Sequence, residues 1–169
     1  MFIKILLAII LFITTLLTSS DCMAQAGIEK QYYINGKVKL ETVYNKRHEK
    51  HGIEKLYYET GELWSKTIYM RDRKDGVEKI YYKSGQMMKE KPYMKGMLYG
   101  TEAAYWENGE LMEEISYIDG MKDGAAKYYD IDGTLMEEKI WESNQLIETR
   151  KTNLRATSVN NMSTSVGQP

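Results

Sequence analysis

Apolar and polar residues alternate with a period of two along most of this chain, in short stretches that meet at a glycine. The segments YYETGELW (57–64) and YWENGELM (105–112) show the pattern clearly. Alternation by two is typical of a half-buried β-strand, and glycine beside paired aromatic residues is unfavourable inside a helix. Each segment therefore predicts two short strands joined by a tight turn, which is a β-hairpin.

The hairpin pattern recurs every 24 residues. Two series of glycines and one of tyrosines share this spacing: Gly52, Gly76, Gly100, Gly124; Gly61, Gly85, Gly109, Gly133; Tyr57, Tyr81, Tyr105, Tyr129. An earlier partial copy runs from Tyr32 through Gly36 to Tyr44, followed by a linker that is one residue longer. About five tandem copies predict an all-β fold, an elongated single-layer antiparallel sheet of ten strands in which only neighbouring units touch.

The dipeptides before each second strand predict the turn and the register. Asn35-Gly36, Thr60-Gly61, Ser84-Gly85, Asn108-Gly109 and Asp132-Gly133 favour a two-residue type I′ turn, which needs positive φ at both positions. A two-residue loop sets Tyr58 opposite Leu63, Tyr57 opposite Trp64 and Leu56 opposite Ser65. Leu56, Tyr58, Leu63 and Tyr69 then share the more buried face. We expect Pro92 to make its strand irregular or edge-like.

The same register places a row of tyrosines against tryptophan and methionine on the opposite face. This candidate partner-binding face consists of Tyr57, Trp64, Tyr81, Met88, Tyr105, Met112, Tyr129 and Met136. Two interpretations are open. The row either packs one strand against the next in a thin sheet, or it forms an exposed aromatic strip that binds another protein.

The amino-terminal residues have the composition of an export signal. Lys4 is the only charge before Asp21, and the apolar run Ile5–Leu17 is shorter than the ~20 residues that a spanning helix needs. Ala24-Gln25-Ala26 is a small-x-small cleavage site, so residues 1–26 are predicted to be a signal peptide and the mature protein to be exported, without stable membrane insertion. The alternative is a lipoprotein anchored through Cys22.

Composition limits the remaining functions. The net charge is -1, which gives no field for holding nucleic acid, and the single Cys cannot form an internal disulfide. The repeats are expected to occupy 27–148. Residues 149–169 contain no aromatic residue and are rich in Thr, Ser and Asn, so a disordered polar tail is predicted there.

No group of residues predicts catalysis, a cofactor or a metal site. His48 and His51 lie in one linker and would need a third ligand. Asp130-Ile131-Asp132-Gly133 begins like a calcium loop, but Leu135 and Trp141 stand where an EF-hand needs Gly and Glu. We therefore interpret the histidines as part of an exposed linker and Asp132-Gly133 as a hairpin turn.

The recurring Tyr-Tyr-x-x-Gly segments, with their aromatic end in TIY, KPY, ISY and KIW, resemble the MORN-repeat variant of bacterial proteins commonly labelled YwqK-like antitoxins. The resemblance covers roughly 32–148 and implies β-hairpins that serve as a protein- or membrane-facing surface, without catalytic residues. The sequence thus predicts an exported, non-enzymatic protein-interaction scaffold, with an antitoxin-like relationship. The alternative is a module that binds cell-envelope glycan.

Overall fold

The computed structural model describes residues 27–152, and these form one open antiparallel sheet of thirteen strands. The strands are β1 (Gly27–Tyr32), β2 (Val38–Tyr44), β3 (Gly52–Tyr57), β4 (Leu63–Met70), β5 (Arg73–Lys74), β6 (Gly76–Tyr81), β7 (Met87–Met94), β8 (Met97–Leu98), β9 (Gly100–Tyr105), β10 (Leu111–Ile118), β11 (Met121–Tyr129), β12 (Leu135–Glu142) and β13 (Gln145–Lys151). No helix in this part of the chain is long and apolar enough to cross a membrane.

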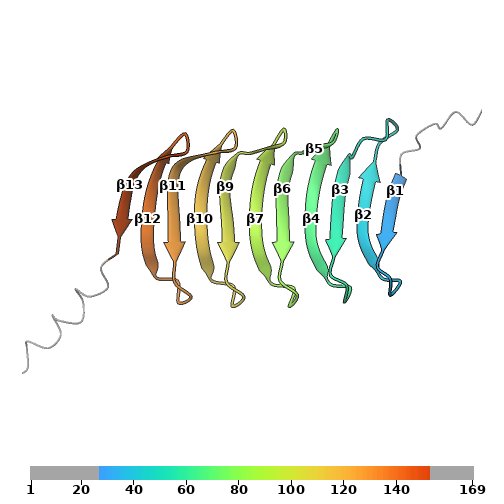
Figure 1. The fold of residues 1–169 in the computed structure, drawn as a ribbon, viewed down its shortest axis with the longest axis horizontal. Coiled ribbons are helices and arrows are strands. Elements are labelled where there is room, and N and C mark those ends of the chain that lie inside the picture. The colour runs from blue at the N-terminus through green and yellow to red at the C-terminus, as the bar shows by residue number, and fades with distance from the viewer. Residues whose placement is uncertain (1–26, 153–169) are drawn as a thin grey trace, which may run out of the picture.

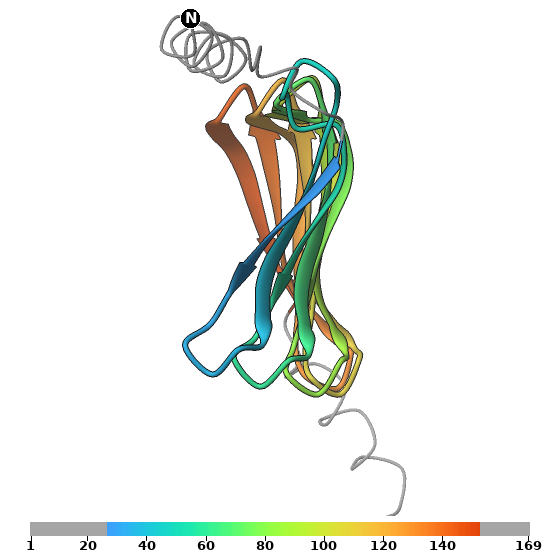
Figure 2. The same cartoon turned by 90° about the vertical axis from the view of Figure 1, so that its right-hand side faces the viewer.

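The sheet is a single layer that follows chain order. Neighbouring strands in space are neighbours in sequence, while the short β5 and β8 pair only with β4 and β7 (Figure 1). Seen from its side, the layer is curved (Figure 2). The expected all-β repeat architecture is confirmed, but the sheet has thirteen strands and not the predicted ten, because β5, β8 and β13 were not expected.

The ends of the repeat region differ from the prediction. The first copy is a complete hairpin, because β1 carries GIEK at 27–30 just as β3 carries GIEK at 52–55. At the other end, 149–151 belong to β13 and not to a tail. The predicted signal peptide, Cys22 and the rest of the predicted tail lie outside the described residues.

The turn at Gly61 is not type I′. Gly61 N–H donates to the Tyr58 carbonyl (2.9 Å), Tyr58 N–H donates to the Glu62 carbonyl (2.8 Å), and Gly61 has φ +104° while Thr60 does not have positive φ. This is a three-residue connection closed by a glycine in the left-handed region. The predicted pairing of Tyr58 with Leu63 is therefore wrong.

True two-residue turns occur at the opposite ends of the strands, within segments predicted as links. Arg71 and Asp72 both have positive φ (51° and 63°), and Met70 pairs directly with Arg73. The equivalent turns are Lys95-Gly96, Asp119-Gly120 and Ser143-Asn144. The first linker is one residue longer because His48, at φ 58°, closes a longer turn between Asn45 and Glu49.

Pro92 does not interrupt its strand. β7 has the same length as β4 and β10, and Pro92 pairs with Val77. The Pro92 carbonyl accepts the Tyr99 N–H at 3.0 Å, so the missing N–H falls where β8 gives way to β9 at Gly100. Proline is tolerated at such a break in the ladder, and the expected irregularity is wrong.

One surface of the sheet is buried by its own long side chains, and we call it the packed face. Its buried residues include Thr42, Glu54, Ser65, Thr67, Glu102, Ala104, Ile115 and Ala126. The expectation that the face with Leu56 and Tyr69 is the more buried one is confirmed. No side chain among the described residues is both large and fully buried, as expected for a sheet with no second layer.

Buried carboxylates on the packed face are paired with lysines. Glu54 accepts hydrogen bonds from Lys50 and from the Thr42 hydroxyl (3.0 Å), while the Lys50 ammonium lies 4.8 Å from the Tyr69 ring centroid. One repeat later, Lys74 and Glu78 form the same pair at 2.7 Å. These contacts satisfy the charge that burial would otherwise make costly.

Candidate functional site

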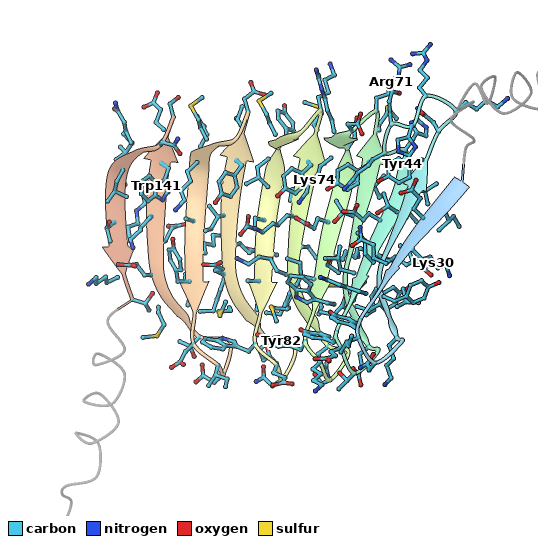
Figure 3. All side chains as sticks on the ribbon, turned by 45° about the vertical axis from the view of Figure 1, so that its right-hand side comes forward. Lys30, Tyr44, Arg71, Lys74, Tyr82 and Trp141 are labelled. Atoms are coloured by element: carbon cyan, nitrogen blue, oxygen red, sulfur yellow. The ribbon has the colours of Figure 1, made fainter. Side chains whose placement is uncertain are left out.

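The surface opposite the packed face is built from three rows of side chains, and we call it the open face. Its rows run across the strands because residues that pair in an antiparallel sheet point to the same side. Side chains project from both surfaces of the layer, with Tyr82 at one end of the strands and Arg71 at the other (Figure 3).

The first row contains the four predicted tyrosines. Tyr57, Tyr81, Tyr105 and Tyr129 are half-buried, and they pair with Leu63, Met87, Leu111 and Leu135. The predicted partners were Trp64, Met88, Met112 and Met136. The structure brings the tyrosines together as a row but does not give them these partners.

A β-bulge in each second strand causes the difference. Tyr57 pairs with Leu63 and Leu56 with Ser65, so Trp64 is the additional residue. The Trp64 ring lies 6.3 Å from that of Tyr58, which follows Tyr57 and so points to the other side of the strand. Trp64 therefore leaves the tyrosine row, and Met88, Met112 and Met136 hold the same position in their repeats. The predicted Leu56–Ser65 pair is confirmed, because the bulge restores the register.

Two of the four tyrosine hydroxyls contact carboxylates of the preceding hairpin. The Tyr57 hydroxyl donates to Glu41 Oε2 at 3.0 Å, and the Tyr129 hydroxyl lies 3.4 Å from Glu114 Oε2. Burial, and secondly the hydrogen bond to Glu41, raises the pKa of Tyr57. Burial likewise raises the pKa of Tyr105 and of Tyr129. These three phenols therefore stay neutral at neutral pH.

The second row is charged and crosses the whole sheet. Its residues, in strand order, are Lys30, Glu41, Lys55, Lys66, Lys79, Glu90, Ala103, Glu114, Lys127, Glu138 and Arg150. Three lysines are consecutive at Lys55, Lys66 and Lys79. Lys79 pairs with Glu90, and Lys55 lies 3.8 Å from Glu41, but within 27–152 no ion pair involves Lys66.

Charges on either side of Lys66 in this row form ion pairs. Lys30 Nζ lies 2.7 Å from Glu41 Oε1, and this hydrogen bond lowers the pKa of Glu41 while raising that of Lys30. A hydrogen bond from Lys79 to Glu90 raises the pKa of Lys79. The stretch around Lys66 thus keeps an excess of positive charge on an otherwise balanced face.

The third row is aliphatic and exposed, and the sequence reasoning missed it. Ile53 and Ile68 pair with each other and are 44% and 41% exposed, and Val77 in the next repeat is 38% exposed. The sequence contained a signal for this row, namely the patterns I-x-K-x-Y in β3 and V-x-K-x-Y in β6. In each pattern the aliphatic residue, the lysine and the tyrosine alternate along the strand, so all three lie on one face. β3, β4 and β6 together present aliphatic, cationic and aromatic rows side by side.

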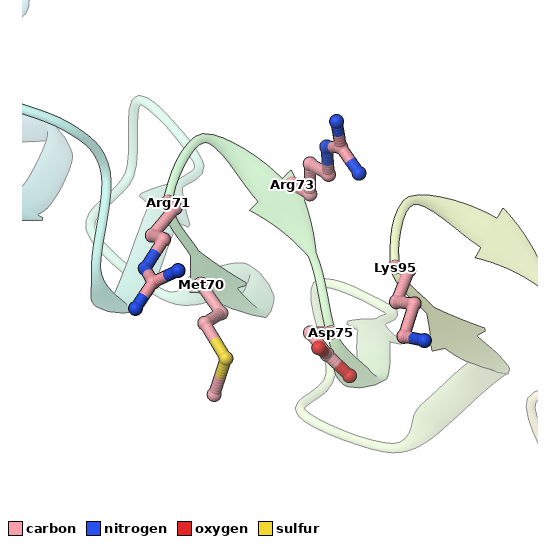
Figure 4. A pocket seen from close by; sticks show the side chains of 5 residues that line it. All are labelled: Met70, Arg71, Arg73, Asp75 and Lys95. Atoms are coloured by element: carbon pink, nitrogen blue, oxygen red, sulfur yellow. The ribbon is translucent and has the colours of Figure 1, made fainter.

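Residues of the described part of the chain also line hollows outside β3, β4 and β6 or at their ends. One, of about 390 Å³, is lined by Met70, Arg71, Arg73, Asp75 and Lys95 beside the two-residue turns (Figure 4). Another is a shallow hollow of about 180 Å³ on the open face, lined by Thr101, Glu114, Ser116, Ala125 and Lys127. The second hollow exists because the small residues Thr101, Ser116 and Ala125 stand where earlier repeats carry Ile68 and Val77.

The two histidines do not converge on a ligand site. His48 stacks on Tyr44, with ring centroids 4.6 Å apart, and its Nε2 lies 3.8 Å from Glu29. His51 uses its backbone N–H to bond the Val43 carbonyl. In the described region no three His, Cys, Asp or Glu side chains are placed to hold a metal ion together. Asp130 to Gly133 form a hairpin turn, as predicted.

Comparison with known families adds one result. The family described as "MORN repeat variant" matches this sequence four times, at residues 25–46, 50–70, 74–95 and 98–119, which together cover more than half of the chain. The fifth hairpin, β11–β12, has the same register and bulge although it lies outside these matches. Among curated proteins, no sequence matches this chain.

Proposed function

Because this chain belongs to the MORN repeat variant family, whose repeats commonly bind proteins or membranes, we propose that it is a non-enzymatic scaffold that binds another protein through the open face of β3, β4 and β6. One observation carries the proposal. Aliphatic side chains are exposed there directly beside three consecutive lysines and the tyrosine row. Adjacent exposed apolar residues with a charged rim are typical of interaction sites.

The chemistry of the face defines the partner. Lys55, Lys66 and Lys79 favour a segment that carries carboxylates, while Ile53, Ile68 and Val77 favour apolar side chains one row away. An extended or helical protein segment with an acidic edge and an apolar edge meets both demands. Opposite charge across such an interface speeds association and selects the partner.

Export and an antitoxin-like role belong to this proposal as finer points. The export signal rests on residues 1–26, and the antitoxin relationship rests on the resemblance of the repeats. If both hold, the partner is itself an exported protein. The non-enzymatic part of the proposal is supported by His48, whose ring stacks on Tyr44 and lies beside Glu29.

The test is affinity capture of partners from the cell envelope, with the tagged protein as bait. It compares the wild type with a variant of the open face and with a control variant on the same strand, β4. Lys66→Glu with Ile68→Ser alters the open face of β4, whereas Trp64→Ser alters the residue beside Tyr58 at nearly the same exposure, 42% against 41% for Ile68. We expect the first variant to lose a specific protein that the wild type and Trp64→Ser retain, with all three melting as folded proteins.

Equal capture by both variants would refute the open face as the binding site. Loss only in Trp64→Ser would move the site to the other surface. Retention on envelope polysaccharide, with no protein captured, would favour the glycan-binding alternative instead.

A further inference from the structure

Among residues 27–152, β13 is an edge strand of the sheet, with a neighbouring strand on one side only. All seven of its residues are exposed. The Thr152 N–H donates to the Met136 carbonyl at 3.0 Å. Backbone groups along an antiparallel strand point alternately to its two sides. The backbone N–H and C=O groups of Arg150 and Glu148 therefore also point to β12. The N–H and C=O of Thr149 therefore point away from the sheet.

The sequence of β13 is complementary to itself about Thr149. A two-fold axis normal to the sheet would set two copies of β13 antiparallel, with Thr149 opposite Thr149. The two threonines would then exchange two backbone hydrogen bonds, and Glu148 would lie opposite Arg150 of the second copy. Both side chains lie on the open face at 48% and 58% exposure, where they pair with each other within one chain. In the dimer each would exchange this partner for the same group of the second copy, across neighbouring strands.

The other edge of the sheet is not complementary to itself. The Tyr33 N–H donates to the Lys37 carbonyl, so by the same alternation the backbone groups of Ile28 and Lys30 point outward from β1. Pairing β1 with itself about its middle sets either Lys30 opposite Lys30 or Glu29 opposite Glu29. Like charges directly opposite each other are destabilising in a sheet.

We propose that this protein forms a symmetric dimer by pairing β13 with β13 of a second copy, which joins the two sheets into one. The two-fold axis normal to the sheet keeps each face on its own side, so the two open faces become one continuous surface. Such a dimer presents two copies of the face around Lys66 to a partner. The self-pairing also covers one edge that would otherwise be open to unspecific strand addition.

Sedimentation equilibrium of the protein as its cells process it tests the dimer, with one proline variant at each edge. Thr149→Pro removes the outward N–H at the centre of the proposed interface and breaks no bond to β12. Ile28→Pro removes an outward N–H from β1 and serves as the matched control. We expect twice the chain mass for the wild type and for Ile28→Pro, and the mass of one chain for Thr149→Pro.

A second variant tests the charge register. Glu148→Lys places a lysine opposite Arg150 of the second copy, so two positive charges face each other across the axis. We expect this variant to raise the dissociation constant of the dimer at least tenfold, and we expect the increase to be smaller at high salt, which screens the repulsion. A monomeric wild type would overturn the proposal. So would a dimer that survives Thr149→Pro, while dissociation by Ile28→Pro, or assemblies larger than a dimer, would show that β1 forms the contact.

Discussion

Lys89 forms an ion pair with Glu102, as Lys50 and Lys74 do with the corresponding glutamates of earlier repeats. Leu98 occupies the position where those repeats carry the lysine, and Glu102 is only 5% exposed. Lys89 Nζ bonds Glu102 at 2.9 Å and Glu113 at 3.1 Å. Burial lowers the pKa of Lys89, but the two carboxylates more than offset this effect and its pKa is raised.

We predict that Lys89→Met destabilises the protein by about 2–4 kcal/mol, because it leaves a buried carboxylate without its cation. The difference in the free energy of unfolding between this variant and the wild type should be largest at neutral pH. It should disappear as the pH rises through the raised pKa of Lys89, where the wild type also loses this charge. Urea unfolding monitored by tyrosine and tryptophan fluorescence measures it.

The exposed Lys83 at a turn tip provides the control for that experiment. Lys83→Met should change the free energy of unfolding by less than about 0.5 kcal/mol. Equal effects of the two substitutions would show that the pair between Lys89 and Glu102 does not stabilise the fold.

At the scale of the element, the two glycines of each repeat have different roles. Gly85 closes a hairpin at φ +88° with open space around its Cα, whereas Gly76 begins β6 at φ +121° with Ile68 Cδ1 only 3.0 Å from where a Cβ would lie. Both positions disfavour a side chain through their φ. Of these two glycines, only Gly76 also lacks room for a side chain, because the Ile68 side chain of the neighbouring strand β4 lies there.

Gly85→Ala is therefore expected to cost about 1–2 kcal/mol through backbone strain alone. Gly76→Ala should cost a further 1–3 kcal/mol or so, since it adds overpacking against Ile68. Chemical denaturation of the two variants side by side gives the comparison, and a cost for Gly85→Ala as large as that for Gly76→Ala would contradict it.

Elements of this sheet are also tied together at their ends by contacts one repeat apart. The Tyr33 hydroxyl donates to the Tyr57 carbonyl, Tyr58 to that of Tyr81, and Tyr82 to that of Tyr105, at 2.6–2.8 Å. These bonds explain why the second tyrosine of each Tyr-Tyr pair recurs: it fixes the spacing between hairpins. At the fourth junction Trp106 takes this position, and within residues 27–152 its buried Nε1 has no hydrogen-bond partner.

At the scale of the whole molecule, burial is uneven along the sheet. The buried apolar residues within 27–152 all lie in β9, β10 and β11, whereas β1 and β13 are exposed along their entire length. These buried residues are Ala103, Ala104, Ile115 and Ala126. Each hairpin contacts only its neighbours, so local stability should follow local burial.

Hydrogen exchange should therefore be slowest in β9–β11 and fastest in β1. Peptide-level exchange measured by mass spectrometry resolves this gradient. β13 provides an internal comparison, because its protection should rise with protein concentration if it pairs with a second copy, while that of β1 should not. Uniform protection from β1 to β13 would mean that the sheet opens as one cooperative unit.

The sequence alone determined the class of the fold, the 24-residue repeat, the hairpins and the single layer, because alternation by two and recurring turn glycines are local features. It also located the tyrosine row. Complete pairing of β1 was missed because the first GIEK lies 25 and not 24 residues before the second.

Only the tertiary structure decided which side chains share a face. The three-residue turn shifts the register at Leu63, and one additional residue, at Trp64 and its equivalents, restores it from Ser65 onward, so only Leu63 and Trp64 exchanged the sides that the simple register assigned to them. A local pattern does not show such a bulge, because it is stabilised by pairing with the adjacent strand. The exposed row of Ile53, Ile68 and Val77 beside Lys66 likewise exists only once three strands of two repeats lie in register.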